Sequence, residues 1–189
     1  MPGGIMPPGY DAPMAREASL AEALHAASAY EPLSAQLHLF GQFVGAWDLE
    51  WHGLDTAGVP IVVRGELHFG WILGGRAVQD VWQVPVDEKD AARMRAFHGT
   101  TIRFYDPELG AWRSTWMDPL NGRVRRFVGR AVGDAIVLEG LDADPLERWS
   151  FRDITPDTFL WRGERSTDGG RTWTIEDEMI ARRRAAPSS

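Results

Sequence analysis

The segment Phe40-Gly41-Gln42-Phe43-Val44-Gly45-Ala46-Trp47 separates two kinds of pattern in this sequence. It ends in a Gly-x-Trp step and opens a run of short apolar segments that contains most of the nine tryptophans. Such a run is typical of an antiparallel barrel. The interior of a small barrel is filled either by side chains or by one small ligand, so the segment bears on function as well as on fold.

Length and composition indicate one globular domain. The chain has 189 residues, of which 44% are hydrophobic, and it has no cysteine. The lack of cysteine excludes disulfides, thiolate nucleophiles and sulfur-ligated metal sites. The N-terminus shows no secretion signal, and no apolar stretch reaches the roughly 18 residues of a membrane span. We therefore expect a cytoplasmic protein.

The charge argues against nucleic acid and anionic membranes as partners. The formal net charge is −7, from 20 basic and 27 acidic residues, which repels both kinds of partner. One basic cluster stands out, but alternation along a strand divides it between two faces. It consists of Arg123, Arg125, Arg126 and Arg130. We interpret this cluster as a solvated strand.

Four regions follow one another along the chain. Residues 1–14 are rich in proline and glycine and predict a disordered tail. Residues 15–44 predict one or two short helices, over 15–29 and 33–44, that pack on the barrel or cap it. Residues 45–183 form the predicted barrel, and residues 184–189 a second tail.

The barrel region predicts an all-β, up-and-down antiparallel fold of about ten strands. Turn residues such as Asn121-Gly122 and Asp168-Gly169 separate the strands every eight to twelve positions. No helix-length segment interrupts them, so consecutive strands should pair as a meander. The predicted strands are 47–53, 61–70, 76–84, 97–106, 112–118, 124–130, 135–140, 147–153, 158–164 and 172–181.

Several motifs in this order resemble uncharacterised bacterial lipocalin-like and fatty-acid-binding-protein-like barrels. They are Phe43-x-x-x-Trp47, Leu73-Gly74-Gly75-Arg76, Tyr105-Asp106-Pro107 followed by Trp112-x-x-x-Trp116-x-Asp118, and a closing charged strand with Arg182. The similarity covers about residues 39–182. It implies a calycin-type barrel with a central cavity. It implies no single activity, because related barrels bind hydrophobic molecules while a few catalyse isomerisation or cyclisation.

The segment from Ser166 to Trp173 matches Ser-x-Asp-x-Gly-x-Thr-Trp, the Asp-box hairpin of sialidase-like propellers. A propeller repeats this hairpin in every blade, whereas this chain contains it once. We therefore interpret it as a structural hairpin, in which Ser166 and Asp168 bind turn amides and Trp173 packs.

Alternation along the strands predicts which side chains face the interior. Apolar residues share one face of the first, second and ninth strands, so Trp47, Trp51, Phe69 and Trp161 should point inward. In the same strands the histidines His52 and His68 fall on the outer face, because they alternate with these residues.

Three other strands place polar side chains on the same face as large apolar ones. Their polar residues would add a cation, two carboxylates and an imidazole to an aromatic cavity. These residues are Arg76 and Asp80 with Trp82, His98 with Phe104, and Asp118 with Trp116. Buried charges need partners, so Arg76 should pair with Asp80 or Asp118. The pair is either structural, at a barrel end, or functional, with Arg76 holding a ligand carboxylate or enolate.

Other chemistries lack the residues that they need. The five histidines show no metal-ligand spacing and none lies beyond residue 98, where a haem barrel would want a proximal ligand. The sequence also has no phosphate-binding glycine loop and no nucleophile elbow. We predict no metal and no cofactor.

Three functional hypotheses remain. In the first, the barrel binds a small apolar or aromatic molecule in an aromatic cavity. In the second, it is a cofactor-independent isomerase or cyclase in which His98 moves a proton with help from Asp80 or Asp118. In the third, the barrel is filled and the protein is a scaffold or interaction protein; the sequence leaves a homodimer open. The predicted ligand-binding residues are Trp47, Trp51, Phe69, Arg76, Trp82, Phe104, Trp116 and Trp161.

Overall fold

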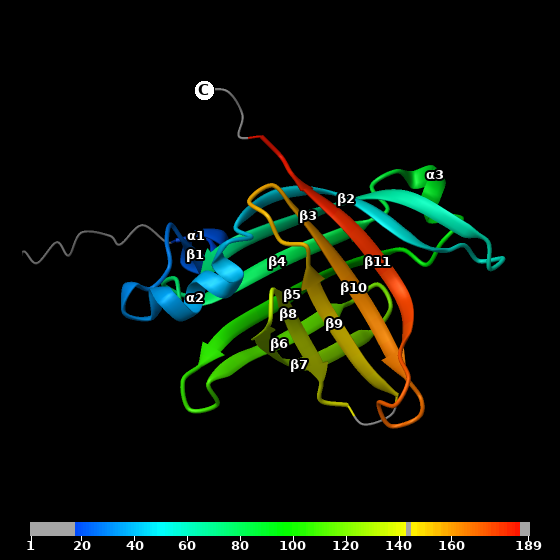
Figure 1. The fold of residues 1–189 in the computed structure, drawn as a ribbon. Coiled ribbons are helices and arrows are strands. Elements are labelled where there is room, and N and C mark those ends of the chain that lie inside the picture. The colour runs from blue at the N-terminus through cyan, green and yellow to red at the C-terminus, as the bar shows by residue number, and fades with distance from the viewer. Residues whose placement is uncertain (1–17, 143–144, 186–189) are drawn as a thin grey trace, which may run out of the picture.

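The computed structural model describes residues 18–142 and 145–185, which form a closed antiparallel barrel of ten strands with one extra short strand and a few short helices (Figure 1). The predicted all-β, calycin-like fold class is confirmed. The predicted N-terminal tail lies outside the described residues, and so do residues 186–189. Of the predicted C-terminal tail, Arg184 is described and forms ion pairs with Asp48 and Glu66, both at 2.7 Å.

The ten barrel strands follow the predicted meander. Each strand pairs with the next one along the chain, and β11 pairs with β2 to close the barrel. Every predicted strand is present, with its ends within two residues of the prediction. The strands are β2 (Gly45–Leu54), β3 (Pro60–Ile72), β4 (Ala77–Val84), β5 (Phe97–Asp106), β6 (Ala111–Asp118), β7 (Arg123–Val132), β8 (Ala135–Gly140), β9 (Leu146–Arg152), β10 (Thr158–Ser166) and β11 (Thr174–Arg183).

The first helix is shorter than its composition suggests. Within the described residues, α1 (Leu20–Leu24) begins at a Ser19 capping box and buries no side chain. It ends because the next residues form the short strand β1 (His25–Ala26), which pairs with the end of β3. The remaining helices are η1 (Glu31–Leu33), α2 (Ser34–Gly41) and α3 (Glu88–Ala91), the last of which the sequence analysis missed.

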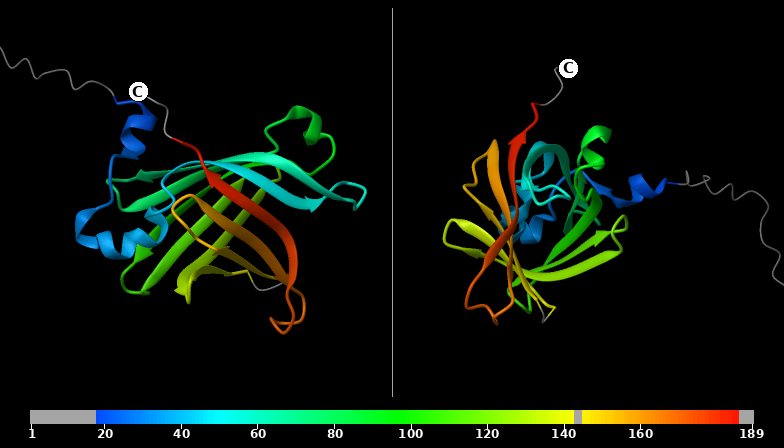
Figure 2. Two further views of the ribbon diagram at one scale, coloured as in Figure 1. Left: turned by 45° about the horizontal axis from the view of Figure 1, so that its top comes forward. Right: turned by 90° about the vertical axis from the view of Figure 1, so that its right-hand side faces the viewer.

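Helix α2 closes one end of the barrel (Figure 2). Leu37 and Phe40 of this helix are fully buried. The ring centroid of Phe40 lies 4.8 Å from that of Trp112 and 5.8 Å from that of Phe151. The Phe40 side chain therefore fills the space between the strands at this end, and α2 acts as a plug.

The Gly-x-Trp step joins α2 to the barrel. Gly45 has a φ of 132°, a conformation that favours glycine, and a side chain there would collide with Arg183. The guanidinium of Arg183 donates to the carbonyl oxygens of Gln42 and Val44 and stacks on the Trp47 ring at 4.1 Å. Arg183 therefore holds the last strand, the first strand and the helix end together.

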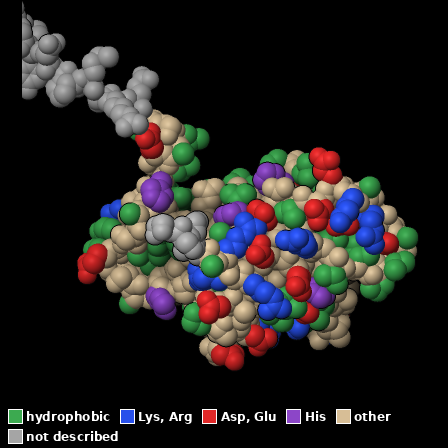
Figure 3. All heavy atoms as spheres, turned by 90° about the horizontal axis from the view of Figure 1, so that it is seen from above, with side chains coloured by type: hydrophobic (Ala, Val, Ile, Leu, Met, Phe, Trp, Pro, Cys, Tyr) green, Lys and Arg blue, Asp and Glu red, His purple; other side chains and the backbone are tan. Residues whose placement is uncertain are grey.

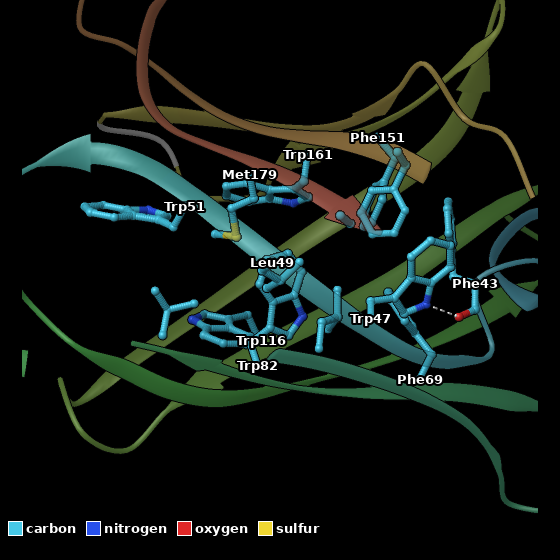
Figure 4. Close-up of a cluster of buried hydrophobic side chains, with 14 of the residues drawn as sticks. Phe43, Trp47, Leu49, Trp51, Phe69, Trp82, Trp116, Phe151, Trp161 and Met179 are labelled. Carbon is cyan, nitrogen blue, oxygen red and sulfur yellow. Dashed lines mark hydrogen bonds between the residues drawn. The ribbon is translucent and has the colours of Figure 1, made fainter. Parts of the chain in front are cut away.

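Aromatic side chains fill the barrel interior and divide between its two ends (Figure 4). Phe43, Trp47, Phe69 and Phe151 gather at the end closed by α2, and the Trp47 indole donates to the carbonyl of Phe43 at 2.7 Å. The second group lies toward the opposite end, and it consists of Trp51, Trp82, Trp116, Trp161 and Met179. The inward orientation expected for β2, β3 and β10 is thus confirmed.

The predicted orientation of β5 is wrong. His98 and Phe104 lie on the outer face, where Phe104 is 44% exposed. The inward positions are instead Gly99, Thr101 and Arg103, all of which are buried. The sequence pattern misled because a glycine and a charged residue face the core. A Cβ atom on Gly99 would lie 2.4 Å from the Trp116 ring, so this position has to be glycine.

The buried cation of the barrel is Arg103, and the expected pairing of Arg76 with Asp80 or Asp118 is wrong. Arg103 pairs with Asp80 at 2.6 Å, with both side chains at most 2% exposed. The guanidinium also lies over the Phe40 ring, at 4.8 Å. Arg76 precedes β4 in the turn that leads into it, so its side chain lies outside and stacks on Tyr30 at 3.7 Å. The ion pair is therefore structural, beside the α2 plug.

The outer surface is strongly charged, with acidic and basic side chains interspersed (Figure 3). Cross-strand ion pairs such as Arg162–Glu178, at 2.7 Å, link neighbouring strands there. The Asp-box hairpin between β10 and β11 is structural, as predicted. Asp168 accepts hydrogen bonds from the amides of Arg171 and Thr172, both at 2.9 Å, and Trp173 donates to Gly170.

Substituting Arg103 tests the role of the buried pair. Arg103→Met leaves the Asp80 carboxylate buried without its partner, and we expect it to lower the free energy of unfolding by about 3–5 kcal/mol. The double variant Asp80→Leu/Arg103→Met removes both charges and should recover most of this loss. Urea unfolding measures both. The control is Arg113→Met, which breaks the exposed pair with Asp106 and should lower the stability far less, because water screens exposed charges. A single variant as stable as this control would contradict the assignment.

Candidate ligand pocket at the open end of the barrel

A pocket of about 80 Å³ opens at the end of the barrel opposite α2. Its walls come from β4, β5, β6, β7, β9, β10 and β11, so residues far apart in the sequence meet there. The lining residues are Trp82, Phe97, Trp116, Asp118, Arg123, Trp149, Trp161, Asp177 and Met179. This volume exceeds what one water molecule needs but is far below the roughly 300 Å³ at which pockets for drug-sized ligands begin. The pocket can therefore enclose one end of a small molecule.

Four tryptophans of the pocket form a closed ring of edge-to-face contacts. The centroid of Trp82 lies 6.1 Å from that of Trp116 and 5.3 Å from that of Trp161. Trp149 completes the ring, at 6.2 Å from Trp116 and 5.3 Å from Trp161. Each ring thus fixes the orientation of two neighbours, which makes an ordered aromatic wall.

Asp118 supplies a buried carboxylate to the pocket. The side chain is 2% exposed, and it accepts a hydrogen bond from the Asn121 side chain at 2.6 Å. Asn121 also donates to the carbonyl of Ala96 and accepts from Arg95. The β6–β7 turn and the segment before β5 therefore hold Asp118 in place.

Asp177 supplies a second carboxylate, from β11. The Trp51 indole donates to it at 3.0 Å. Burial raises the pKa of the Asp177 carboxyl, and the neighbouring charge of Glu176 raises it further, whereas the hydrogen bond from Trp51 and the charge of Arg123 oppose the rise. The Asp177 carboxyl therefore holds a proton more readily than an ordinary aspartate.

A wider groove of about 670 Å³ adjoins the pocket and shares Phe97, Arg123 and Asp177 with it. Trp51 and Leu54 from the end of β2 line the groove, together with Arg95 from the segment before β5 and Ile175 and Glu176 of β11. The exposed side chain of Arg123 lies where the two spaces meet. A ligand with one end in the pocket can therefore extend along the groove.

Two hydrogen-bond donors of the pocket lack acceptors. The Nε1 atoms of Trp82 and Trp161 are buried and have no hydrogen-bond partner among the residues that the structure describes. A buried indole N–H normally has an acceptor, since leaving it unsatisfied costs free energy. Both atoms are closed off from solvent, so an acceptor brought by a ligand would satisfy them once the indole rings turn toward it.

The pocket brings together only part of the predicted site. Trp82, Trp116, Trp161 and Asp118 line it, and Trp51 lines the adjoining groove. The other predicted residues lie elsewhere. Trp47 and Phe69 pack at the α2 end, Asp80 pairs with Arg103, and Arg76, His98 and Phe104 lie outside the barrel.

Sequence reasoning missed Trp149, Asp177 and Arg123. Alternation could have placed Trp149 inside, because it shares a face of β9 with Phe151. The same reasoning places Asp177 on the face of Met179 in β11. Arg123 was assigned to a solvated strand, and its position at the barrel mouth depends on the closure of the barrel rather than on local sequence.

In residues 18–142 and 145–185, which the structure describes, no three histidine, aspartate or glutamate side chains lie close enough together to hold a metal ion. No helix in the same part of the chain is long and apolar enough to cross a membrane.

Comparison with known proteins supports the fold. No protein-family model and no curated protein matches this sequence. Rv2717c from M. tuberculosis has a solved structure that is similar with a TM-score of 0.57 and 15% identity, over 84% of this chain and 100% of that one. The S-type phycobiliprotein lyase CPES from Guillardia theta matches with a TM-score of 0.52 and 12% identity, over 79% and 92%. The barrel and both neighbours fit a calycin-like fold, and such identities establish the fold alone.

Asp177 should make stability depend on pH. Its pKa is raised on folding, so its contribution to stability is present below the unfolded value of about 3.9 and is lost as pH rises through the folded value. Relative to wild type, Asp177→Asn should therefore gain stability as the pH rises. Urea unfolding at several pH values measures the difference.

Asp168 provides a control of opposite sign. Hydrogen bonds from Thr172 and Ser166 lower its pKa to about 2, so its contribution is present at neutral pH and is lost as pH falls toward that value. Asp168→Asn should then be less stable than wild type at neutral pH, and the difference should shrink in acid. The same pH trend in both variants would contradict the account.

Proposed function

We propose that this protein binds a small, largely apolar or aromatic molecule at the open end of its barrel. The observation that carries the proposal is the ring of four tryptophans, which lines a pocket, whereas Trp112 packs against Phe40 of the α2 plug. Aromatic walls with a few polar groups are how pockets for such molecules are built. The ligand places one end in the pocket and the rest in the groove.

The two alternative functions have less support. In the isomerase or cyclase hypothesis His98 moves a proton, but His98 lies on the outer face of β5 and Asp80 is occupied by Arg103. In the scaffold hypothesis side chains fill the barrel. They do so at the α2 end, whereas the pocket and groove remain open at the other.

A neutral fluorescent probe tests the proposal. Phenylnaphthylamine emits strongly in apolar sites, so its fluorescence should rise on binding to the wild-type protein. Trp161→Ala removes one wall of the pocket and should weaken binding by about tenfold, the equivalent of about 1.4 kcal/mol. The matched control, Trp173→Ala, changes a tryptophan of the Asp-box hairpin outside the pocket and should leave the affinity unchanged.

Circular dichroism and urea unfolding check that both variants are folded. Equal affinity of the wild-type protein and Trp161→Ala would show that the probe binds elsewhere. A wild-type protein that does not bind the probe would count against an apolar pocket.

A further inference from the structure

The two carboxylates of the pocket have neutral partners. Asp118 is bound by the side chain of Asn121, and Asp177 is bound by the indole of Trp51. Neither forms an ion pair with any residue in the described part of the chain. Two other acids at this end of the barrel are paired, since Arg125 lies 2.8 Å from Glu147 and Arg148 lies 2.9 Å from Glu164. The lining of the pocket thus contains two carboxylates, those of Asp118 and Asp177, against one guanidinium, that of Arg123.

Arg123 does not supply the missing countercharge. Its side chain is exposed at the mouth, whereas Asp118 is 2% exposed and lies deeper. The charge of Arg123 favours the ionised form of Asp177, yet the pKa of Asp177 remains raised because burial outweighs it. In the deep part of the pocket Asp118 therefore has a neutral partner, Asn121, and forms no ion pair within the described residues.

The tryptophan ring adds to the attraction. Indole faces carry negative electrostatic potential and attract cations, most strongly where water is excluded. Trp82, Trp116 and Trp161 are each at least nine-tenths buried, so this part of the pocket is shielded from water. Carboxylates and indole rings together favour a cation that is bulky and weakly hydrated.

The unpartnered indole donors point to a second group on the ligand. Nε1 of Trp82 and Nε1 of Trp161 require an acceptor, which a cation alone does not provide. An oxygen atom close to the cationic centre would meet this requirement. The 80 Å³ of the pocket suits such a head group, and the groove would hold any longer remainder.

We propose that the ligand carries a small organic cation, an alkylated ammonium group with a nearby oxygen acceptor, which enters the tryptophan ring beside Asp118 and Asp177. This inference rests on the proposed function, because it specifies the chemistry of the molecule that the same pocket binds. The ammonium group lies against the indole rings and the two carboxylates, while its oxygen accepts from the unpartnered indoles.

Choline and its uncharged carbon isostere, dimethylbutanol, test this inference. The two molecules have the same shape and the same hydroxyl group, and differ in that a carbon atom replaces the nitrogen. Calorimetric titration should show that choline binds the full-length protein at least about tenfold more tightly than the alcohol. Asp118→Asn and Asp177→Asn should each reduce this ratio. The control, Glu139→Gln, changes an exposed acid outside the pocket and should leave the ratio unchanged.

The ratio of the two affinities within one variant is insensitive to partial unfolding, since unfolded protein lowers both alike. Equal binding of choline and the alcohol, or a ratio that neither aspartate substitution changes, would overturn the inference. The inference would also be overturned if the protein bound phenylnaphthylamine through Trp161 but did not bind choline. That result would leave the proposed function standing. Failure of the proposed function is recognised separately, by the absence of binding of the neutral probe.

Discussion

The aromatic plug at the α2 end is the constraint on which the rest of the structure depends. A barrel of ten strands has a long interior, and Phe40, Phe43 and Trp47 pack together at one end of it, each at most 1% exposed. The buried guanidinium of Arg103 lies against the Phe40 ring of this plug and forms an ion pair with Asp80. These side chains occupy the α2 end, whereas at the other end the tryptophan ring lines a pocket that adjoins a groove.

The two buried polar sites in the barrel differ in a way that explains their roles. The Asp80–Arg103 pair holds two opposite charges 2.6 Å apart, although Nε and Nη1 of Arg103 have no hydrogen-bond partner among the described residues. Asp118 and Asp177 have neutral partners and border an open pocket. A buried charge without a counterion costs stability unless something supplies one, and proteins commonly accept such costs at binding sites. The first site thus maintains the fold, and the second is available for binding.

Much of the fold could be predicted from the sequence because turn residues and period-two alternation are local signals. They placed every strand and the inward faces of β2, β3 and β10. Alternation failed in β5 for two reasons. Gly99 faces the core because the ring of Trp116 leaves no room for a side chain, and Arg103 is buried because it forms an ion pair with Asp80 of β4. The site was half predicted, through Trp82, Trp116, Trp161 and Asp118. Alternation could have placed Asp177 on the inner face of β11 with Met179, whereas the position of Arg123 at the barrel mouth depends on the closure of the barrel, which no local pattern encodes.

Nuclear magnetic resonance of the indole N–H groups tests the central claim most directly, because the nine tryptophans are distributed over the whole barrel. The account predicts that the signals of the pocket tryptophans shift when the protein is titrated with phenylnaphthylamine. These are Trp82, Trp116, Trp149 and Trp161. The signals of Trp47 and Trp112, at the plugged end, should remain unchanged. Shifts confined to the plugged end, which includes Trp71 beside Gly41 of α2, or to Trp173 of the Asp-box hairpin would contradict a binding site at the open end.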